Sequence, residues 1–349
     1  MSGFISRRPP YSMLAALALT FGLTTTACAD PVADFYKTAQ IRMIIRSDTG
    51  GTYDFYSRML SKYMRAYIPG NPQIININMP GGGGIVAANY VGKIAPRDGT
   101  ILTMVGLGLP VDQALGLSKS FQADLRDFSW LGSISYSNQV LVTWKTSKVQ
   151  TLDDARRIPS QIGSTGAGSV SQQFPSFYNE MLGAKFKIVF GYPSSTQINL
   201  AMERGEIDGS GSTGWAQYLI DAPHYVREKL ITPIIQAGLR KEPDLPDVPL
   251  LIDLARTPEE AAAFRFMSNS VDFGRPIAST PEVPADRLAA LREAFMKTMQ
   301  DPDFIAEVKK SGGEVRPAPA ADTERIVREL IDTPEAVRAK VKAAISERK

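Results

Sequence analysis

The chain repeats one local pattern: a short apolar stretch, then a turn rich in glycine, serine and threonine, then apolar residues at helical spacing. Residues 41–45 are the first apolar stretch, residues 47–52 the turn and residues 54–67 the helical pattern. Residues 74–94 repeat the pattern around the glycine run 80–84. Alternating strands and helices are typical of an α/β fold. The chain is therefore predicted to build at least one sheet with helices packed against it.

A third unit of the same kind lies in the middle of the chain. Residues 160–163 lead into a turn of small residues at 164–169, and residues 171–182 carry a helical pattern. A strand over 187–190 and a helix over 197–204 follow. We interpret this unit as the core of a second α/β domain.

Two amphipathic helices are predicted near the end of the chain, over residues 284–299 and 323–348. A glycine pair at 312–313 lies between them. We expect these helices to pack on the first sheet if the chain returns to it.

The first thirty residues have the pattern of a secretory signal peptide. Arg7 and Arg8 precede an apolar run, residues 13–23, which is shorter than the roughly 20 residues that a membrane-spanning helix needs. The small residues that follow fit the pattern for cleavage after Ala29. The sequence therefore predicts a signal peptide at residues 1–29 and a protein located in the periplasm.

Two other targeting signals are weighed beside this one. Cys28 would be a lipidated N-terminus in a lipoprotein, but the three residues before it lack the leucine-like residue usual there. Ser6 with the arginine pair resembles a twin-arginine signal, although Pro9 and Pro10 follow directly. Lipoprotein anchoring at Cys28 is the less favoured reading.

The charge balance argues against a nucleic-acid or anionic-membrane surface. Without Arg7 and Arg8 the 39 basic side chains become 37, against 36 acidic ones. A basic patch large enough to bind phosphates would normally leave a clear positive excess. The chain is long enough for two domains with cores of ordinary size, so we expect stability to come from packing.

Histidine and cysteine are too scarce for much enzyme chemistry. The chain has one cysteine, Cys28, and one histidine, His224, so a zinc site built on several of these ligands is excluded. A Ser/His/Asp triad would have to use His224, which lies in a polar turn. We expect no metal, no cofactor and no catalytic residue.

The glycine-rich turns are the best candidates for a binding site. Each follows a predicted strand and begins a helix, and a helix N-terminus offers unpaired backbone N–H groups that bind an anion without lysine or arginine. Two such termini facing each other across a cleft would hold a carboxylate or phosphate from both sides. Any one of these turns is equally consistent with a simple tight connection.

Nucleotide hydrolysis is not supported by these turns. Residues 163–169 are similar to a phosphate-binding loop, but no lysine follows the last glycine, Gly168. That lysine neutralises the nucleotide phosphates in such loops. Asp54, in the first turn, is well placed as a helix N-cap, or else orients groups around a ligand.

An ordered set of motifs resembles the Bug-type substrate-binding proteins of tripartite tricarboxylate transporters. The set covers nearly all of the chain after the signal peptide and is more specific than any single motif. It comprises residues 41–45, Gly50-Gly51-Thr52-Tyr53-Asp54, Asn78-Met79-Pro80 with the four glycines that follow, residues 95–100, residues 163–169 and Leu245-Pro246-Asp247-Val248-Pro249.

The resemblance implies a two-domain periplasmic binding protein, type II-like, that closes on a small carboxylate in a cleft between the domains. It places domain 1 at residues 30–144 plus 242–349 and domain 2 at residues 145–241. It implies, as partners, the membrane permease subunits of a tripartite tricarboxylate transporter. We expect a monomer with no nucleic-acid partner.

In the family, the ligand's carboxylate is held by backbone and hydroxyl groups of the first-domain turn and of the second-domain Ser-Thr-Gly turn. Carried onto this chain, with neighbouring wall residues, the resemblance implies the following ligand-binding set: Ser47, Gly50, Gly51, Thr52, Tyr53, Asp54, Gly83, Ser164, Thr165, Gly168, Ser169 and Tyr192.

Two departures from the family pattern weaken any prediction of the exact ligand. Residues 46–49, Arg-Ser-Asp-Thr, stand where an apolar or small run is usual, and Tyr192-Pro193 reverses the usual Pro-Tyr order. Arg46 is interpreted either as a carboxylate clamp or as a partner of Asp48 at the cleft rim. Tyr53 either lines the pocket or packs in the core.

The leading hypothesis is a receptor without enzyme activity that delivers a carboxylate to a permease. A sensing subunit for a membrane kinase would use the same fold and cleft. A secreted hydrolase using Ser164 or Ser169 is the third hypothesis, but no Gly-x-Ser-x-Gly elbow with a positioned histidine supports it.

Overall fold

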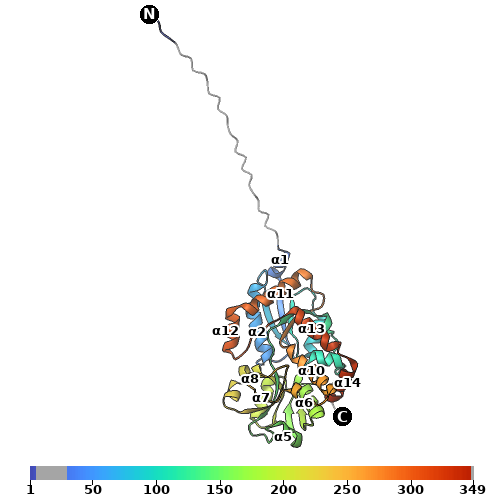
Figure 1. Ribbon diagram of the computed structural model, residues 1–349. Coiled ribbons are helices and arrows are strands. Elements are labelled where there is room, and N and C mark those ends of the chain that lie inside the picture. The colour runs from blue at the N-terminus through green and yellow to red at the C-terminus, as the bar shows by residue number, and fades with distance from the viewer. Residues whose placement is uncertain (5–29, 347–349) are drawn as a thin grey trace. The chain divides into compact units, whose positions relative to one another are not determined.

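Two β-sheets, each covered by helices, organise the chain (Figure 1). The computed structural model describes residues 1–4 and 30–346, so the predictions on Arg7, Arg8, Cys28 and cleavage after Ala29 lie outside the described residues. From Pro31 onward the chain forms one compact unit that contains both sheets. We call the first sheet with its helices the first lobe, and the second sheet with its helices the second lobe.

The first sheet has six strands in the order β11-β4-β10-β3-β1-β2. Strand β1 runs parallel to β2 and β3, with Ile44 opposite Ile77 and Thr103, whereas β10 and β11 pair antiparallel with their neighbours. Its strands are β1 (Gln40–Ile45), β2 (Gln73–Asn78), β3 (Ile101–Met104), β4 (Ser129–Ser133), β10 (Pro276–Ser279) and β11 (Ala318–Pro319).

The second sheet has five strands in the order β7-β6-β8-β5-β9. Strand β6 runs parallel to β7 and β8, and β5 pairs antiparallel with β8 and β9. Its strands are β5 (Gln139–Trp144), β6 (Ser160–Gly163), β7 (Phe186–Val189), β8 (Gly209–Gly214) and β9 (Ile231–Ala237).

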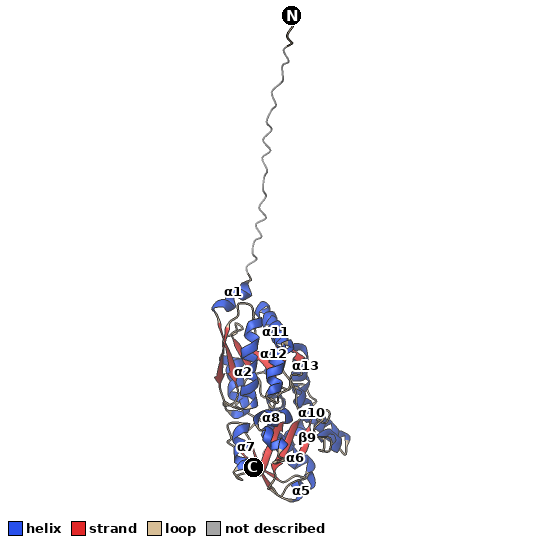
Figure 2. Cartoon of the chain, turned by 90° about the vertical axis from the view of Figure 1, so that its left-hand side faces the viewer, coloured by secondary structure: helices blue, strands red, loops and turns tan. Residues whose placement is uncertain are grey.

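Helices follow most strands and cover the sheets. The α-helices of the described residues are α1 (Pro31–Thr38), α2 (Thr52–Met64), α3 (Ile85–Asn89), α4 (Leu109–Leu115), α5 (Leu152–Arg157), α6 (Val170–Leu182), α7 (Ser195–Glu203), α8 (Trp215–Asp221), α9 (Pro223–Arg227), α10 (Pro258–Asp272), α11 (Ala285–Gln300), α12 (Pro302–Lys310), α13 (Ala320–Ile331) and α14 (Glu335–Ile345). Short 3-10 turns include Gly82–Gly84, just before α3. Helices α2, α11 and α12 gather on one side of the first sheet (Figure 2).

Strand β1 is buried on both faces because helices cover both sides of the first sheet. Met43 and Ile45 pack with α2, α11 and α12, while Ile44 points to the other face and packs with α3. Alternate side chains of a strand point to opposite faces, so a strand buried on both faces is a continuous apolar run. This explains why residues 43–45 are apolar in succession, while Arg42, nearer the start of the strand, is only partly buried.

The strands and helices predicted for the three repeated units are confirmed, with their ends shifted by a few residues. The single helix predicted over residues 323–348 is wrong. The structure has two helices there, α13 and α14, because Pro334 lacks the N–H that a continuing helix would need. Helix α13 packs on β4 of the first sheet, and α14 packs on α6 of the second lobe.

The chain passes between the sheets at positions that differ from the expected domain bounds. Strand β5, which ends at Trp144, was expected in domain 1 but pairs with β8 and β9 in the second sheet. The first crossing therefore lies at residues 134–138. After β9 the chain still contacts the second sheet, because Leu250 forms a β-bridge with Gln236 of β9. It rejoins the first sheet only at β10. The division at Trp144 and Glu242 stays a prediction about domains.

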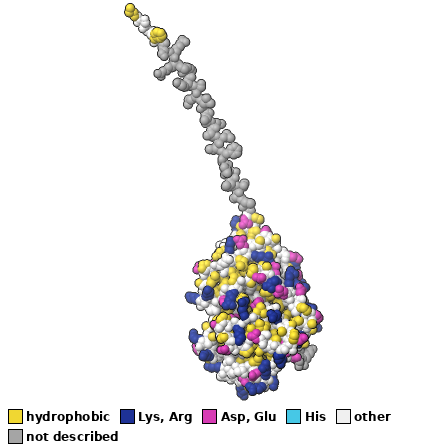
Figure 3. All heavy atoms as spheres, viewed as in Figure 1, with side chains coloured by type: hydrophobic (Ala, Val, Ile, Leu, Met, Phe, Trp, Pro, Cys, Tyr) yellow, Lys and Arg dark blue, Asp and Glu magenta, His cyan; other side chains and the backbone are white. Residues whose placement is uncertain are grey.

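The surface view agrees with the balanced charge of the sequence. On the face shown in Figure 3, basic and acidic side chains are interspersed and do not gather by sign. Within the described ranges, no helix is both long enough and apolar enough to cross a membrane.

Candidate functional site

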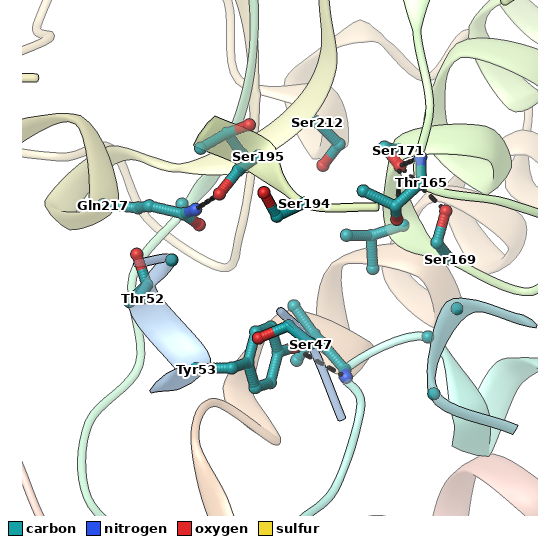
Figure 4. A pocket seen from close by; sticks show the side chains of 18 of the residues that line it. Ser47, Thr52, Tyr53, Thr165, Ser169, Ser171, Ser194, Ser195, Ser212 and Gln217 are labelled. Carbon is teal, nitrogen blue, oxygen red and sulfur yellow. Dashed lines mark hydrogen bonds between the residues drawn. The ribbon is translucent and has the colours of Figure 1, made fainter. Parts of the chain in front are cut away.

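A cavity of about 90 Å³ lies between the two lobes, where strands of both sheets end. The turns that follow β1, β3, β6 and β8 all contribute to its wall. Ser47, Thr52 and Tyr53 of the first lobe face Ser195 and Ser212 of the second across this space (Figure 4). The carboxyl ends of parallel strands are the usual place for ligands in open α/β sheets.

The wall of the cavity is rich in glycine and hydroxyl groups, with a few apolar side chains. Its residues are Arg46, Ser47, Gly51, Thr52, Tyr53, Gly81, Gly83, Gly84, Leu107, Gly108, Ser137, Gln139, Thr165, Ser169, Val170, Ser171, Pro193, Ser194, Ser195, Ile198, Ser212, Thr213, Gly214, Gln217, Val271, Gly274 and Arg275.

Three helices of eight residues or more begin at this wall: α2 and α6, of thirteen residues each, and α7. Their first residues, Thr52, Val170 and Ser195, all line the cavity. The first N–H groups of a helix have no partner within the helix, and the aligned peptide dipoles give that end a partial positive charge. Both lobes therefore direct positive ends of helices at the same space.

Four hydroxyl groups form a network at the start of α6. The Ser169 and Ser171 hydroxyl oxygens lie 2.8 Å apart, and Ser171 also accepts a hydrogen bond of 3.0 Å from the Thr165 backbone N–H. Ser164 lies behind them, fully buried, with its Oγ 3.3 Å from that of Ser171. These contacts hold the turn rigidly, so Thr165, Ser169 and Ser171 have fixed positions at the wall.

The lobes touch each other directly beside the cavity. Thr196 Oγ1 donates a hydrogen bond of 3.0 Å to the carbonyl of Gly50, and Thr52 Oγ1 donates one of 3.2 Å to Asp221 Oδ2. Gly83 is so close to residues Ala167 and Ser169 that a Cβ there would lie 2.9 Å from their backbone atoms. The structure is thus a closed arrangement of the lobes. Hydrogen bonds of this kind contribute about 1 kcal/mol each, so these contacts favour closure only modestly.

Arg46 is the first of two arginines in the wall. Its Nη2 donates a hydrogen bond of 2.6 Å to the Gly83 carbonyl, and its guanidinium lies over the Tyr53 ring at 4.3 Å. Its Nε is buried without a hydrogen-bond partner. In the part of the chain that the structure describes, Arg46 forms no ion pair with Asp48, so the rim-pairing interpretation is not supported.

Arg275 is the second arginine, and its side chain is nearly enclosed, with 8% of its surface exposed. Its Nη1 donates a hydrogen bond of 3.2 Å to Ser135 Oγ, and its guanidinium lies over the Tyr56 ring at 4.6 Å. Among the described residues no carboxylate forms an ion pair with it. Burying a charge without a partner is costly, so an anion that paired with this guanidinium would relieve that cost.

Asp221 is an acidic group whose pKa responds to the charge of Arg275. Burial raises the pKa of the Asp221 carboxyl to about 6, although hydrogen bonds from Gln217 and Thr52 and the charge of Arg275 oppose this rise. If the two groups formed a close ion pair, we would expect the pKa of Asp221 to fall below its ordinary value instead. Asp221 therefore only partly offsets the charge of Arg275.

Asp54 supports the first turn from behind. It is not the N-cap that its position suggested: Gly51 is the N-cap of α2, and Asp54 is the third helical residue. Its Oδ2 accepts a hydrogen bond from the Gly50 N–H, and its Oδ1 accepts from Arg58 and Asn78. Burial alone would raise the pKa of Asp54, but these hydrogen bonds hold it below the ordinary value. The carboxylate shapes the turn and does not reach the cavity.

The structure brings seven of the twelve predicted ligand-binding residues to one cavity: Ser47, Gly51, Thr52, Tyr53, Gly83, Thr165 and Ser169. The other five, Gly50, Asp54, Ser164, Gly168 and Tyr192, do not line it. Gly168 packs against Asp112, and Tyr192 packs against the core beneath α7 and α8, while its neighbours Pro193 and Ser194 take the place at the wall. That any of these residues binds a ligand stays a prediction.

Several wall residues were missed from the sequence. Ser194 and Ser195 precede and begin α7, and Ser212 and Thr213 end β8, so the rule that ligands bind at strand ends would have found them. Arg275 has a weaker signal: it is a single charge between the apolar residues of α10 and β10.

His224 lies outside this cavity. It is the second residue of α9, and its side chain is nearly half exposed. Its Nε2 lies 3.7 Å from Glu203 Oε1, and neither residue lines the cavity. Within the described ranges, no three side chains of His, Cys, Asp and Glu gather as a metal ion would require.

Comparison with known proteins relates the chain to solute-binding proteins by structure alone. No protein-family model and no curated protein matches the sequence. The periplasmic binding protein BugD superimposes with a TM-score of 0.70 at 16% identity, over 89% of this chain and 99% of BugD. MatC from Rhodopseudomonas palustris, solved with bound malate, gives 0.69 at 19% identity, over 88% and 99%. The R. palustris protein Rpa4515, solved with adipate, gives 0.68 at 18% identity, over 88% and 98%.

The chain has the fold of these periplasmic binding proteins. Nearly the full length of each is matched, so the likeness includes both lobes. The predicted α/β fold, that of two-domain periplasmic binding proteins, is confirmed.

Substitution of Gly83 by alanine is expected to open the lobes. The new Cβ would meet the second lobe at 2.9 Å, and the positive φ of 65° adds backbone strain. Gly82→Ala is the matched control, because Gly82 also has a positive φ, of 55°, but its Cβ would meet Ile85 of the same lobe, at 3.3 Å. Small-angle X-ray scattering should show a larger radius of gyration for Gly83→Ala and an unchanged one for Gly82→Ala. Equal radii for both variants would contradict the closed arrangement.

Substitution of Asp221 by asparagine is expected to flatten the dependence of stability on pH. A native pKa of about 6 means that the folded protein keeps this proton to higher pH than the unfolded chain does. The free energy of unfolding should therefore fall as pH rises from about 4 to 6, with a cost of about 3 kcal/mol that persists at pH 7. Asp221→Asn keeps an acceptor for Thr52 and removes this titration.

Urea unfolding from pH 4 to 7 measures the effect of Asp221→Asn. The variant should be more stable than the unchanged protein at pH 7 and similar to it at pH 4. Asp153→Asn, at an exposed position on α5, controls for loss of a surface charge. A variant that is less stable at pH 7 would show that the charged form of Asp221 is the stabilising one.

Proposed function

We propose that the protein is an extracytoplasmic receptor that captures a small carboxylate between its lobes and delivers it to a membrane permease. The proposal places the chain among the Bug-type substrate-binding proteins of tripartite tricarboxylate transporters. It rests on the fold shared with BugD and MatC, and on the ordered motifs of the sequence. No residue of the site is assigned a catalytic role.

The observation that carries the proposal is the electrostatic bias of the cavity. Helix N-termini from both lobes and the guanidinium groups of Arg46 and Arg275 point positive charge at one enclosed space. Hydroxyl and backbone groups around it supply further hydrogen-bond donors. A carboxylate supplies the negative charge and the acceptor oxygens that these groups favour, whereas a neutral or cationic solute would leave all of the charges unpaired.

Closure of the lobes links ligand binding to delivery. Direct contacts between the lobes contribute only a few kcal/mol, so a ligand that touches both walls can tip the balance toward the closed form. A permease that recognises the closed form would then receive loaded receptors. We propose that the two lobes are the two domains that move in this closure. We propose residues 134–138, which connect β4 to β5, as one of the hinge segments.

The two other hypotheses receive less support. A hydrolase using Ser164 or Ser169 needs a base, and His224, the only histidine of the chain, lies outside the cavity. A sensing subunit would use the same cavity, but a solved structure of the same fold, with a TM-score of 0.70 and 18% identity, is a periplasmic transporter. We therefore propose transport, with the periplasm as the location after removal of residues 1–29.

A thermal-shift screen tests the proposed ligand class. The probes are small mono-, di- and tricarboxylates, malate and adipate among them, with sugars and amines as controls. A ligand at about 100 times its dissociation constant stabilises a fold by roughly 2.7 kcal/mol, which is a clear rise in melting temperature. At least one carboxylate should give such a rise. Rises with sugars or amines alone would overturn the proposal.

A further inference from the structure

Two arginines from other parts of the chain lie over tyrosines in the first turns of helix α2. Arg46 lies over Tyr53 and Arg275 lies over Tyr56, and these tyrosines are three residues apart, so they are neighbours on one side of the helix. The arginines come from distant parts of the chain: Arg46 directly follows β1, and Arg275 directly precedes β10. Both line the cavity. The fold thus brings two separate cations to the wall of one cavity.

Each tyrosine is fixed by its own hydroxyl group. Tyr53 Oη accepts a hydrogen bond of 3.1 Å from the Leu107 backbone N–H. Tyr56 Oη exchanges hydrogen bonds of 2.9 and 3.0 Å with the backbone of Glu314, and its ring is fully buried. The rings are therefore rigid supports, and the two guanidinium groups above them have defined positions.

Neither cation is neutralised within the described residues. Arg275, more than nine-tenths buried, has the Ser135 hydroxyl as its hydrogen-bond partner and no ion pair. Arg46 has the Gly83 carbonyl, and its buried Nε has no partner. Asp221, the acidic group that acts on Arg275, is occupied by hydrogen bonds from Thr52 and Gln217. Two donors with unused capacity therefore remain at the wall.

We propose that Arg46 and Arg275 determine specificity, each binding one acidic group of a small dicarboxylate. This inference rests on the proposed function. It adds that the ligand has two acidic groups, and it names the residue that binds each one. A planar guanidinium pairs with a carboxylate through two parallel hydrogen bonds, so each arginine holds one acid group in a set orientation. A monocarboxylate would leave one buried cation unpaired, and this difference provides the selectivity.

Isothermal titration with acids of matched chain length tests the inference. The probes are succinate, glutarate and adipate against butyrate, valerate and hexanoate, with protein unfolded and refolded to remove bound solute. At least one diacid should bind about 30-fold or more tightly than its monoacid, because losing one partner of a buried charge pair costs about 2 kcal/mol or more. Arg275→Gln should remove most of this preference, because diacid affinity should fall much more than monoacid affinity.

Stability of the ligand-free protein separates a binding role from a structural one. If Arg275 serves the ligand, Arg275→Gln removes an unpaired buried charge, so the melting temperature should rise while stabilisation by the diacid falls. If Arg275 serves only packing over Tyr56 and its bond to Ser135, the melting temperature should fall and the diacid preference should persist. Arg287→Gln is the matched control, since Arg287 lies over Phe35 at 3.5 Å, away from the cavity. It should leave diacid binding unchanged.

The outcomes distinguish failure of this inference from failure of the proposed receptor function. Equal binding of diacids and monoacids, or a diacid preference that survives Arg275→Gln, would overturn the two-cation inference and leave the carboxylate receptor standing. Failure of every acid to bind would overturn both.

Discussion

The position of the cavity depends on parallel strand pairing, of β1 with β2 and β3 and of β6 with β7 and β8. Strands that run the same way end at the same edge of their sheet, so their turns collect there, and each turn begins a helix. The structure sets the two edges against each other. The positive ends of α2, α6 and α7 then share one cavity, and glycines in the turns let the backbones approach. The site is a consequence of topology before it is a matter of side chains.

Side chains add strength and selectivity to this arrangement. Helix ends alone attract an anion by a fraction of a charge, whereas Arg46 and Arg275 each present a full one. Hydrogen bonds between the lobes are few, and they involve Thr52, Thr196 and the Gly50 carbonyl. The balance between open and closed forms is therefore sensitive to what occupies the cavity. We expect an anionic ligand to act most strongly on the unpaired charge of the buried Arg275 guanidinium.

The sequence predicted the elements that periodicity and glycine turns specify, and those turns do meet in the cavity. It failed where tertiary contacts decide. Arg275 follows α10 and reaches the site only because β10 enters the middle of the first sheet, between β3 and β4. Residues 139–144 were not predicted as a strand, and the bound at Trp144, which came from the resemblance, did not indicate that they pair in the second sheet. Tyr192 precedes the wall residue Pro193, and Ser164 is buried behind the wall residues. Local sequence patterns do not resolve such small differences in position.

A crystal structure of the protein grown with succinate, glutarate or adipate, whichever binds most tightly, tests the central claim most directly. We predict that one carboxylate of the diacid lies within hydrogen-bond distance of the Arg275 guanidinium, with the other on Arg46, and that the lobes remain closed around it. A diacid held by the helix N-termini alone, with water between it and Arg275, would contradict the account.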